Sequence, residues 1–224
     1  MEKAAAFLET RRYASMLGAT TELNKEEGIT FDPKSNTLFV SISDLTGGML
    51  DNSGAQDKAG PNAIRLNANR CGVVYALDLA PNGAIGSNYV ASNWRALVEG
   101  VGTTYPVGSP YAGNTCSVNG IANPDNITFI PEHNTLIIGE DTGTGHQNDV
   151  VWSVDMVTRK MTRIQTTPYG AEATSAYWYP NINGFSYLMS VVQHPYGESD
   201  SDKASASAVE RRAYVGYIGP IAVK

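Results

Sequence analysis

Acidic residues at a fixed spacing are the first feature of this sequence that could carry chemistry. Asp125 lies 98 residues after Glu27 (125 − 27), and each precedes the same pattern, Ile-Thr-Phe followed by Asn-Thr-Leu. The match runs without a gap from residues 29–38 onto residues 127–136, which chance explains poorly. Because an internal repeat governs the choice of fold, carboxylates at equivalent positions of this repeat predict a shared site.

The elements that would position these acids are short strands. Hydrophobic runs separated by Pro, Asn and Gly turns predict about three four-stranded units, the third incomplete, after a helix at residues 3–17. Four-stranded units of this kind are typical of β-propellers, which usually close with about 4–8 blades. We therefore expect an all-β fold, a partial β-propeller that forms one domain over residues 1–224. Its blades would be residues 27–122 with long insertions, 123–170, and 171–224.

Two parts of this organisation are less regular. Residues 93–97 are interpreted as a short helix, and the fourth strand of the first unit is not assigned. Three blades leave two unpaired edges, which is a liability in solution. We therefore expect further blades N-terminal to this chain, or another chain, to complete the ring.

Composition excludes several classes of function. The 224 residues are 42% hydrophobic and 17% charged, with 22 Gly, 11 Pro and 12 Tyr, as expected of a turn-rich β protein. The net charge of −6 argues against nucleic acid as a partner and permits cation binding. No apolar run is long enough for a transmembrane segment, and the first residues lack a signal-peptide pattern. Cys71 and Cys116 have no zinc spacing; two free thiols are expected, with a disulfide as the alternative.

The first strand of each propeller blade lines the central channel, so a residue just before it lies at the channel mouth. Glu27, Asp125 and Glu172 occupy this position in the three units. Converging carboxylates repel one another and raise each other's pKa unless a cation lies among them. Oxygen ligands suit Ca²⁺ or Mg²⁺, and also Fe³⁺. The alternative interpretation is that these acids cap turns by accepting backbone N–H hydrogen bonds.

Other polar residues would complete this site. Asn126 adds a neutral oxygen beside Asp125. Glu140 and Asp141, at the exit of the second strand of the same unit, would form an outer shell of the metal site. His146 lies in a glycine-rich loop and is either a further ligand or a structural histidine. Lys25, two residues before Glu27, would contact an anionic substrate or simply neutralise Glu26.

Several motifs together resemble the PhoX-type alkaline phosphatase family. The matching segments, in order along the chain, are Arg12–Thr20 leading to Lys25–Gly28, then Asn123–Asn126, Glu140–Thr142 and Gln193–Pro195. The resemblance implies a six-bladed propeller that holds calcium and iron ions at the channel mouth and hydrolyses phosphate monoesters. It further implies that Glu27 is a metal ligand, that Asp125 and Asn126 form a calcium-site pair, and that Lys25 contacts phosphate. The family prefers Arg at that last position, and Lys lacks its bidentate fork.

The resemblance covers the C-terminal part of such an enzyme. The family's cysteine iron ligand and a further acid belong to N-terminal blades that nothing in this sequence matches, so neither cysteine is assigned to iron. Family members are exported, which implies a periplasmic or secreted parent protein. Two other functions are consistent with the same acids: a calcium-dependent lactonase-like propeller, and a non-catalytic propeller piece that binds another chain.

Overall fold

The fold is all-β with two short N-terminal helices. A computed structural model describes residues 2–51, 62–198 and 203–223. The helix expected at residues 3–17 is instead two helices, α1 (Glu2–Leu8) and α2 (Thr10–Met16), interrupted at Glu9, whose φ of −133° is not helical. Neither helix buries a residue, so no packing requires one continuous helix. No helix in the described residues is long and apolar enough to cross a membrane.

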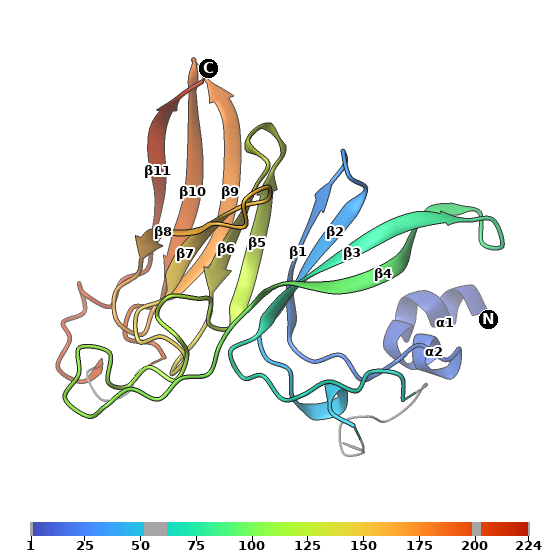
Figure 1. Cartoon of the computed structure of the whole chain (residues 1–224), viewed down its shortest axis with the longest axis horizontal. Coiled ribbons are helices and arrows are strands. Elements are labelled where there is room, and N and C mark those ends of the chain that lie inside the picture. The colour runs from blue at the N-terminus through green and yellow to red at the C-terminus, as the bar shows by residue number, and fades with distance from the viewer. Residues whose placement is uncertain (1, 52–61, 199–202, 224) are drawn as a thin grey trace.

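Three antiparallel sheets follow the helices (Figure 1). The first sheet has the order β1-β2-β3-β4 and the second β5-β6-β7-β8, while the third has the order β11-β10-β9. In chain order the strands are β1 (Glu26–Asp32), β2 (Thr37–Ile42), β3 (Val73–Asn82), β4 (Ser87–Glu99), β5 (Pro124–Ile130), β6 (Thr135–Glu140), β7 (Val150–Asp155), β8 (Met161–Thr166), β9 (Glu172–Ile182), β10 (Phe185–Gln193) and β11 (Tyr214–Ala222). Two 3-10 turns, η1 (Gly47–Met49) and η2 (Pro131–His133), complete the described elements.

The helix expected at residues 93–97 is wrong. These residues lie inside β4, which pairs along its length with β3. Trp94 stacks edge-on against Tyr75 at 5.5 Å between ring centroids, and Arg95 forms an ion pair with Asp78 of β3. Cross-strand pairs of this kind stabilise a strand, and they outweigh the local pattern that suggested a helix.

The sequence repeat is preserved in the backbone. Ile29 pairs with Val40 in the first sheet, and Ile127 pairs with Ile138 in the second, so both partners keep the 98-residue offset. Both strand pairs also contain a register shift at the same place, between residues 26 and 29 and between residues 124 and 127. Two units therefore share strand order, register and a β-bulge at the start of the first strand.

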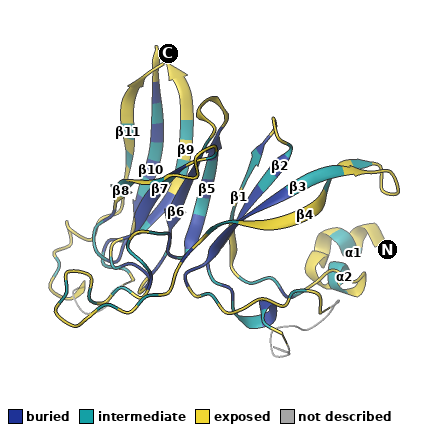
Figure 2. Cartoon of the chain, in the orientation of Figure 1, coloured by how far each residue is buried: buried dark blue, intermediate teal, exposed yellow. Residues whose placement is uncertain are grey.

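The core lies between the sheets, and the second sheet is the most deeply buried (Figure 2). Phe39 of β2 packs against Phe129 of β5, with ring centroids 5.5 Å apart. Apolar residues of β6 and β7 pack on the other side against Ala173 and Leu188 of the third sheet. The first strands of the sheets, β1, β5 and β9, are neighbours in that order, as in the inner ring of a propeller.

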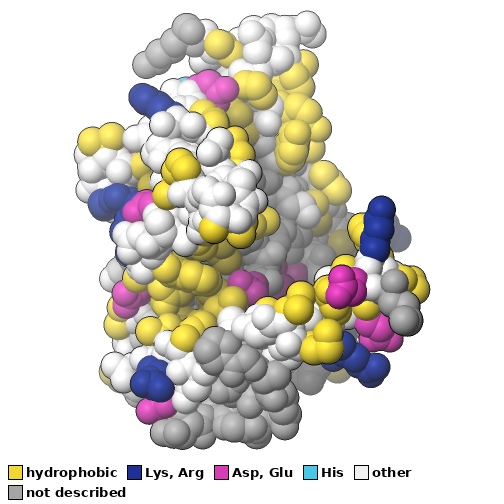
Figure 3. Space-filling view, turned by 90° about the vertical axis from the view of Figure 1, so that its right-hand side faces the viewer, with side chains coloured by type: hydrophobic (Ala, Val, Ile, Leu, Met, Phe, Trp, Pro, Cys, Tyr) yellow, Lys and Arg dark blue, Asp and Glu magenta, His cyan; other side chains and the backbone are white. Residues whose placement is uncertain are grey.

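Repeat-equivalent residues differ in burial because the first sheet has a neighbour on one side only. Ile29 is 65% exposed, whereas Ile127 at the equivalent position is 6% exposed. Strand β5 packs against both β1 and β9, whereas in the described part of the chain β1 packs extensively against β5 alone among the first strands. Figure 3 shows hydrophobic side chains exposed on the side of the molecule that carries the helices and the β3–β4 hairpin. The outer face of the first sheet is therefore open.

The two cysteines form a disulfide, so the expectation of free thiols is wrong. Cys71 and Cys116 are joined by an S–S bond of 2.01 Å, and both side chains are buried. The bond ties the start of β3 to the long connection that leads into β5. The backbone N–H of Asn123, just before β5, also donates to the Cys71 carbonyl at 3.0 Å. Sequence spacing alone could not bring together residues 45 positions apart.

Candidate functional site

The first strands begin at the same end of the molecule, the lower end in Figure 1, and each carries an acid there. Glu27 and Asp125 are the second residues of β1 and β5, inside the repeated bulge, and Glu172 is the first residue of β9. A β-bulge redirects the side chains within it, and bulges are frequent beside active sites. The Ser41 hydroxyl accepts from the Gly28 N–H in the first bulge and donates to the backbone carbonyl of Asp125 in the second, and thereby ties the two bulges together.

Carboxylates from these strand ends converge. One oxygen from each of Asp125, Asp141 and Glu172 lies within 4.8 Å of the others. Asp125 is only 7% exposed, and burial raises its pKa to about 6, with further contributions from the negative charges of Asp141, Glu27 and Glu172. Four of the acids selected from the sequence are therefore electrostatically coupled in one place.

Lys25 provides a positive charge at the edge of this cluster. Its Nζ lies 2.7 Å from the Glu27 carboxylate, and both side chains are partly exposed. The hydrogen bond to Glu27 raises the pKa of Lys25, with smaller contributions from the charges of Glu27, Asp141 and Asp125, so the ammonium is charged at neutral pH. The backbone of Lys25 is left-handed, with φ of 52°.

Asn126 connects the acids to the third sheet. Its amide nitrogen donates to Asp125 Oδ1 at 2.9 Å, and its amide oxygen accepts a hydrogen bond from the Ser175 N–H at 2.6 Å. Both ends of the amide are engaged by protein groups in this arrangement. Asn126 therefore fixes the orientation of the Asp125 carboxylate and links β5 to β9.

A polar pocket of about 230 Å³ opens beside Asp141. Asp44 and Arg70 line it together with Asn123 and the loop that follows Asp141, Thr142–Thr144. Arg70 is exposed and is the only basic residue of this lining. Sequence reasoning missed Asp44 and Arg70 because they lie in the irregular segment between β2 and β3, outside the repeat. No pattern in the sequence singles them out.

His146 is structural, and so is the adjacent Glu140. His146 is 2% exposed; its Nδ1 lies 2.8 Å from Glu140 Oε2, and its Nε2 lies 3.1 Å from the Ser117 carbonyl. Burial alone would lower the pKa of His146, but the hydrogen bond to Glu140 and the charge of Glu140 raise it. The Glu140 carboxylate also accepts from the indole of Trp152 and from two backbone N–H groups. Neither ring nitrogen of His146 is available to a metal, so the ligand role considered for it is not supported by the geometry.

A further buried acid lies beneath the cluster. Asp149 is fully buried, and burial raises its pKa to about 10, aided by the charges of Glu140, Asp141 and Glu172. Its Oδ2 accepts the Thr142 N–H at 3.0 Å, while its Oδ1 has no hydrogen-bond partner among the described residues. At neutral pH this carboxyl is protonated, and it anchors the loop that carries Asp141.

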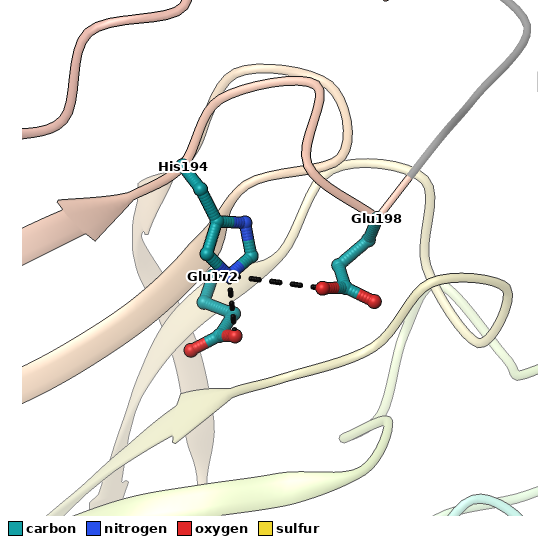
Figure 4. Close-up of side chains that lie close together, drawn as sticks. All are labelled: Glu172, His194 and Glu198. Atoms are coloured by element: carbon teal, nitrogen blue, oxygen red, sulfur yellow. Dashed lines mark hydrogen bonds and ion pairs between the residues drawn. The ribbon is translucent and has the colours of Figure 1, made fainter.

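A second group of potential ligands adjoins the first. Glu172, His194 and Glu198 each offer one atom, and these atoms lie within 4.8 Å of one another (Figure 4). His194 directly follows β10, as Asp141 directly follows β6. That correspondence is the sequence signal that could have identified His194. Glu172 belongs to both groups.

Comparisons with known proteins support the fold. No known protein family matches the sequence, and no curated protein matches it. A solved structure with a similar fold is PhoX of Pseudomonas fluorescens in complex with vanadate, a transition-state analogue, at a TM-score of 0.64 and 22% sequence identity. The similarity covers 95% of this chain. The chain spans 36% of the length of that protein. This similarity establishes a propeller-type fold for the chain.

The arrangement has a clear chemical consequence. Four carboxylates outnumber the basic groups beside them, which are Lys25 at Glu27, Arg70 in the pocket beside Asp141, and His194 at Glu172. Negative charge therefore predominates at this end of the strands. Such a site attracts hard cations, which accept several carboxylate oxygens at once. It repels anions unless cations are bound.

Proposed function

We propose that this chain is the C-terminal part of a metal-dependent phosphate-monoester hydrolase of the PhoX type. The observation that carries the proposal is the convergence of Asp125, Asp141 and Glu172, with Glu27 close enough to raise the pKa of Asp125. Three of these acids occupy the start of successive inner strands. For two of them, Glu27 and Asp125, the resemblance to the PhoX-type family implies a role as metal ligands. Similarity in fold to PhoX is a second, weaker support.

These residues would be more stable with a calcium ion bound among them than without one. Without a cation, four acids share one region, and the pKa of Asp125 is raised first by burial of its carboxyl and then by the charges of Asp141, Glu27 and Glu172. The carboxylate groups come from three different strands and one loop, so one ion can draw ligands from both the second and the third sheet. Calcium accepts 6–8 oxygen ligands in flexible geometry, and further ligands would come from water, substrate or additional blades.

Each residue then has a definite role. Asp125, Asp141, Glu172 and Glu27 would hold calcium, and Asn126 would keep the Asp125 carboxylate in place through its 2.9 Å hydrogen bond. The bound cation supplies charge that polarises phosphoryl oxygens and orients a nucleophile. Lys25 would donate to the phosphate from the rim, since its ammonium is charged and partly exposed.

Completion of the site requires further blades. The open face of β1, where Ile29 is 65% exposed, offers an apolar surface for a preceding blade of the same protein or of another chain. Any iron ion would take its remaining ligands from those blades, because both cysteines of this chain are joined in a disulfide. We propose that efficient hydrolysis depends on that assembly, whereas calcium and phosphate binding begin within this chain.

The disulfide supports an extracellular location for the parent protein. Buried disulfides persist in oxidising compartments such as the bacterial periplasm and are rare in the cytosol. Cys71 and Cys116 are both buried and bonded. We therefore propose a periplasmic or secreted enzyme.

Calorimetric titration of Ca²⁺ into chelator-stripped protein tests the proposal. We expect saturable binding that weakens at least tenfold in Asp125→Asn, which removes one charged ligand and keeps the shape of the side chain. Glu132→Gln is the matched control, because Glu132 is an exposed acid at the opposite end of β5. Inorganic phosphate should then bind the calcium-loaded protein and not the stripped protein.

The outcomes separate the alternatives. Calcium binding that Asp125→Asn leaves unchanged would refute the site. Calcium binding without phosphate binding, together with turnover of a lactone panel, would identify a lactonase-like propeller instead. No calcium binding, with association into a larger assembly on size exclusion, would identify a non-catalytic piece.

A further inference from the structure

We propose that Arg70 is a specificity residue, which binds a second anionic group carried by the alcohol portion of the substrate. The site would then prefer phosphate monoesters whose alcohol bears a carboxylate. This inference rests on the proposed function, because it names the substrate class of the same site. Lys25 is paired with Glu27, whereas Arg70 lines the pocket beside Asp141.

The pocket that Arg70 lines adjoins the cluster of acids. Asp141 belongs both to this lining and to the group that converges with Asp125 and Glu172. A phosphate ester held by that group would therefore find space for its alcohol portion beside Asp141. The pocket volume of about 230 Å³ is below the roughly 300–1,000 Å³ of sites for drug-sized ligands, so it suits an alcohol of a few carbon atoms.

The Arg70 side chain is available to a ligand. It is exposed, and within the described residues no ion pair or hydrogen bond engages its guanidinium. Other arginines are occupied: Arg95 is paired with Asp78, and Arg163 donates to the Val118 carbonyl. A guanidinium presents its N–H donors in a planar fork that matches a carboxylate.

The backbone around Arg70 is held in place. The disulfide joins the residues that directly follow Arg70 and Thr115, so it fastens two walls of the pocket together. The Asn123 side-chain amide donates to the Arg70 carbonyl at 3.0 Å, and the Asn123 carbonyl accepts the Asp141 N–H at 3.1 Å. Arg70 is thus attached at a fixed place relative to Asp141, as a specificity residue requires.

Charge makes anion binding at Arg70 depend on calcium. Asp44 and Asp141 also line the pocket, so without a cation two carboxylates outnumber one guanidinium. Hydrogen bonds from the Asn24 and Thr46 side chains hold the Asp44 carboxylate. A calcium ion at Asp141 would offset this negative charge, and Arg70 would then attract a second anionic group. An uncharged alcohol gains no such attraction, which is the source of the selectivity.

Calorimetry with two matched esters tests the inference. 3-Phosphoglycerate has a carboxylate where glycerol 3-phosphate has a hydroxymethyl group, and inorganic phosphate is the reference ligand. Ca²⁺ is kept at the same saturating concentration in cell and syringe. We expect the wild-type chain to bind 3-phosphoglycerate at least about tenfold more tightly than glycerol 3-phosphate.

Substitution of Arg70 should remove this preference alone. Arg70→Gln should bring the affinities for the two esters within about threefold of each other and leave the affinity for inorganic phosphate within about threefold of wild type. Arg65→Gln is the matched control, because Arg65 is an exposed arginine of the same connection that pairs with Asp51 and does not line the pocket.

Salt provides a second measurement that needs no variant and serves if Arg70→Gln does not fold. The preference of the wild type for 3-phosphoglycerate should weaken as the NaCl concentration rises, because the guanidinium is exposed and its attraction is screened. A preference that is insensitive to salt would overturn the inference.

The remaining outcomes separate this inference from the proposed function. Equal affinities of the wild type for the two esters, or a preference that Arg70→Gln retains, would overturn the inference and leave the proposed function standing. An equal fall in the affinities for inorganic phosphate and for 3-phosphoglycerate would place Arg70 on the phosphoryl group and would also overturn it. If the calcium-loaded wild type bound none of the three ligands, the proposed function would fail and this inference with it.

Discussion

Replacing Lys25 by Asn should separate function from folding at one position. Lys25 has φ of 52°, a left-handed conformation that costs most non-glycine residues about 1 kcal/mol or more. Asn123, 98 residues later, has φ of 43° at the equivalent place before β5. Asn adopts this conformation readily because its short polar side chain bonds locally. The equivalent position of the second repeat unit therefore shows which residue type suits this left-handed backbone.

The expected effect on folding is small. Asn at position 25 relieves part of the backbone cost, about 0.5–1 kcal/mol, and removes the partly exposed ion pair with Glu27, which contributes about 0–1 kcal/mol. These contributions oppose each other, so the free energy of unfolding should change by less than about 1 kcal/mol. Chemical denaturation of the stripped protein measures it.

Lys25→Asn should change ligand binding more than it changes folding, and it should change calcium affinity and phosphate affinity in opposite directions. Removing the ammonium makes the acidic cluster more negative, so calcium should bind more tightly. Phosphate bound to the calcium-loaded protein loses a charged hydrogen bond of about 1.5–3 kcal/mol, which corresponds to a tenfold to hundredfold loss of affinity. Calorimetry with Ca²⁺ and then with inorganic phosphate records both changes, and Lys25→Arg should retain phosphate binding.

Two results would refute this reasoning. If Lys25→Asn lowered the free energy of unfolding by more than about 2 kcal/mol and left phosphate affinity unchanged, Lys25 would be structural. If calcium and phosphate affinities fell together, the ammonium would be supporting the acidic cluster and not the anion.

Three further predictions follow from burial, charge and connectivity. Ile127→Ala should lower the free energy of unfolding by about 2–4 kcal/mol, because Ile127 is only 6% exposed. Ile29→Ala should change it by less than about 0.5 kcal/mol, because Ile29 is 65% exposed. Denaturant titrations measure both values, and equal losses would mean that β1 is covered in solution. The pKa of Asp125 in the folded protein, about 6, exceeds the ordinary aspartate value of 3.8, so the folded protein holds a proton that the unfolded protein releases between these pH values. Stability of the stripped protein should therefore fall as pH rises from about 4 to 6, by at most about 3 kcal/mol, and bound Ca²⁺ or Asp125→Asn should reduce that fall. Replacing both Cys71 and Cys116 by Ser should lower the free energy of unfolding by about 2–4 kcal/mol, measured by denaturation of the variant and of the oxidised wild type. An unchanged free energy would show that the disulfide, which joins residues 45 positions apart, does not stabilise the fold.

The repeat explains why much of the fold could be predicted. The Ile-Thr-Phe and Asn-Thr-Leu blocks specify two strands and the turn between them, and the observed register of β1 with β2 and of β5 with β6 preserves their offset. Strand β4 could not be predicted because its partners come from β3: Trp94 contacts Tyr75, and Arg95 pairs with Asp78. Local pattern carries no information about such cross-strand neighbours.

The same distinction applies to the candidate site. The structure brings Asp125 and Glu172 together, as their places at the start of equivalent strands suggested. The third member of this close group is Asp141, which was expected in an outer shell, whereas Glu27 does not belong to the group. His146 was considered because a glycine-rich loop precedes it, but its role depends on Glu140, which is buried and accepts four hydrogen bonds. Burial decides between a ligand and a structural histidine, and sequence does not report burial at a loop position. His194 and Glu198 converge with Glu172 only through the turn after β10.

The backbone explains how acids can be held close together at all. In the first two sheets a bulge displaces Glu27 and Asp125 from the regular ladder, and the residue two positions before each acid is left-handed. In the third sheet Glu172 begins β9 without the repeat sequence, but β9 has its own irregularity, with Ser175 at φ of 53° bonded to Asn126. Irregular backbone thus recurs at each inner strand, beside each acid. Backbone strain of this kind persists only where the surrounding structure determines it. A cation bound at the proposed site would stabilise the strained conformation by neutralising the carboxylates that this backbone holds close together.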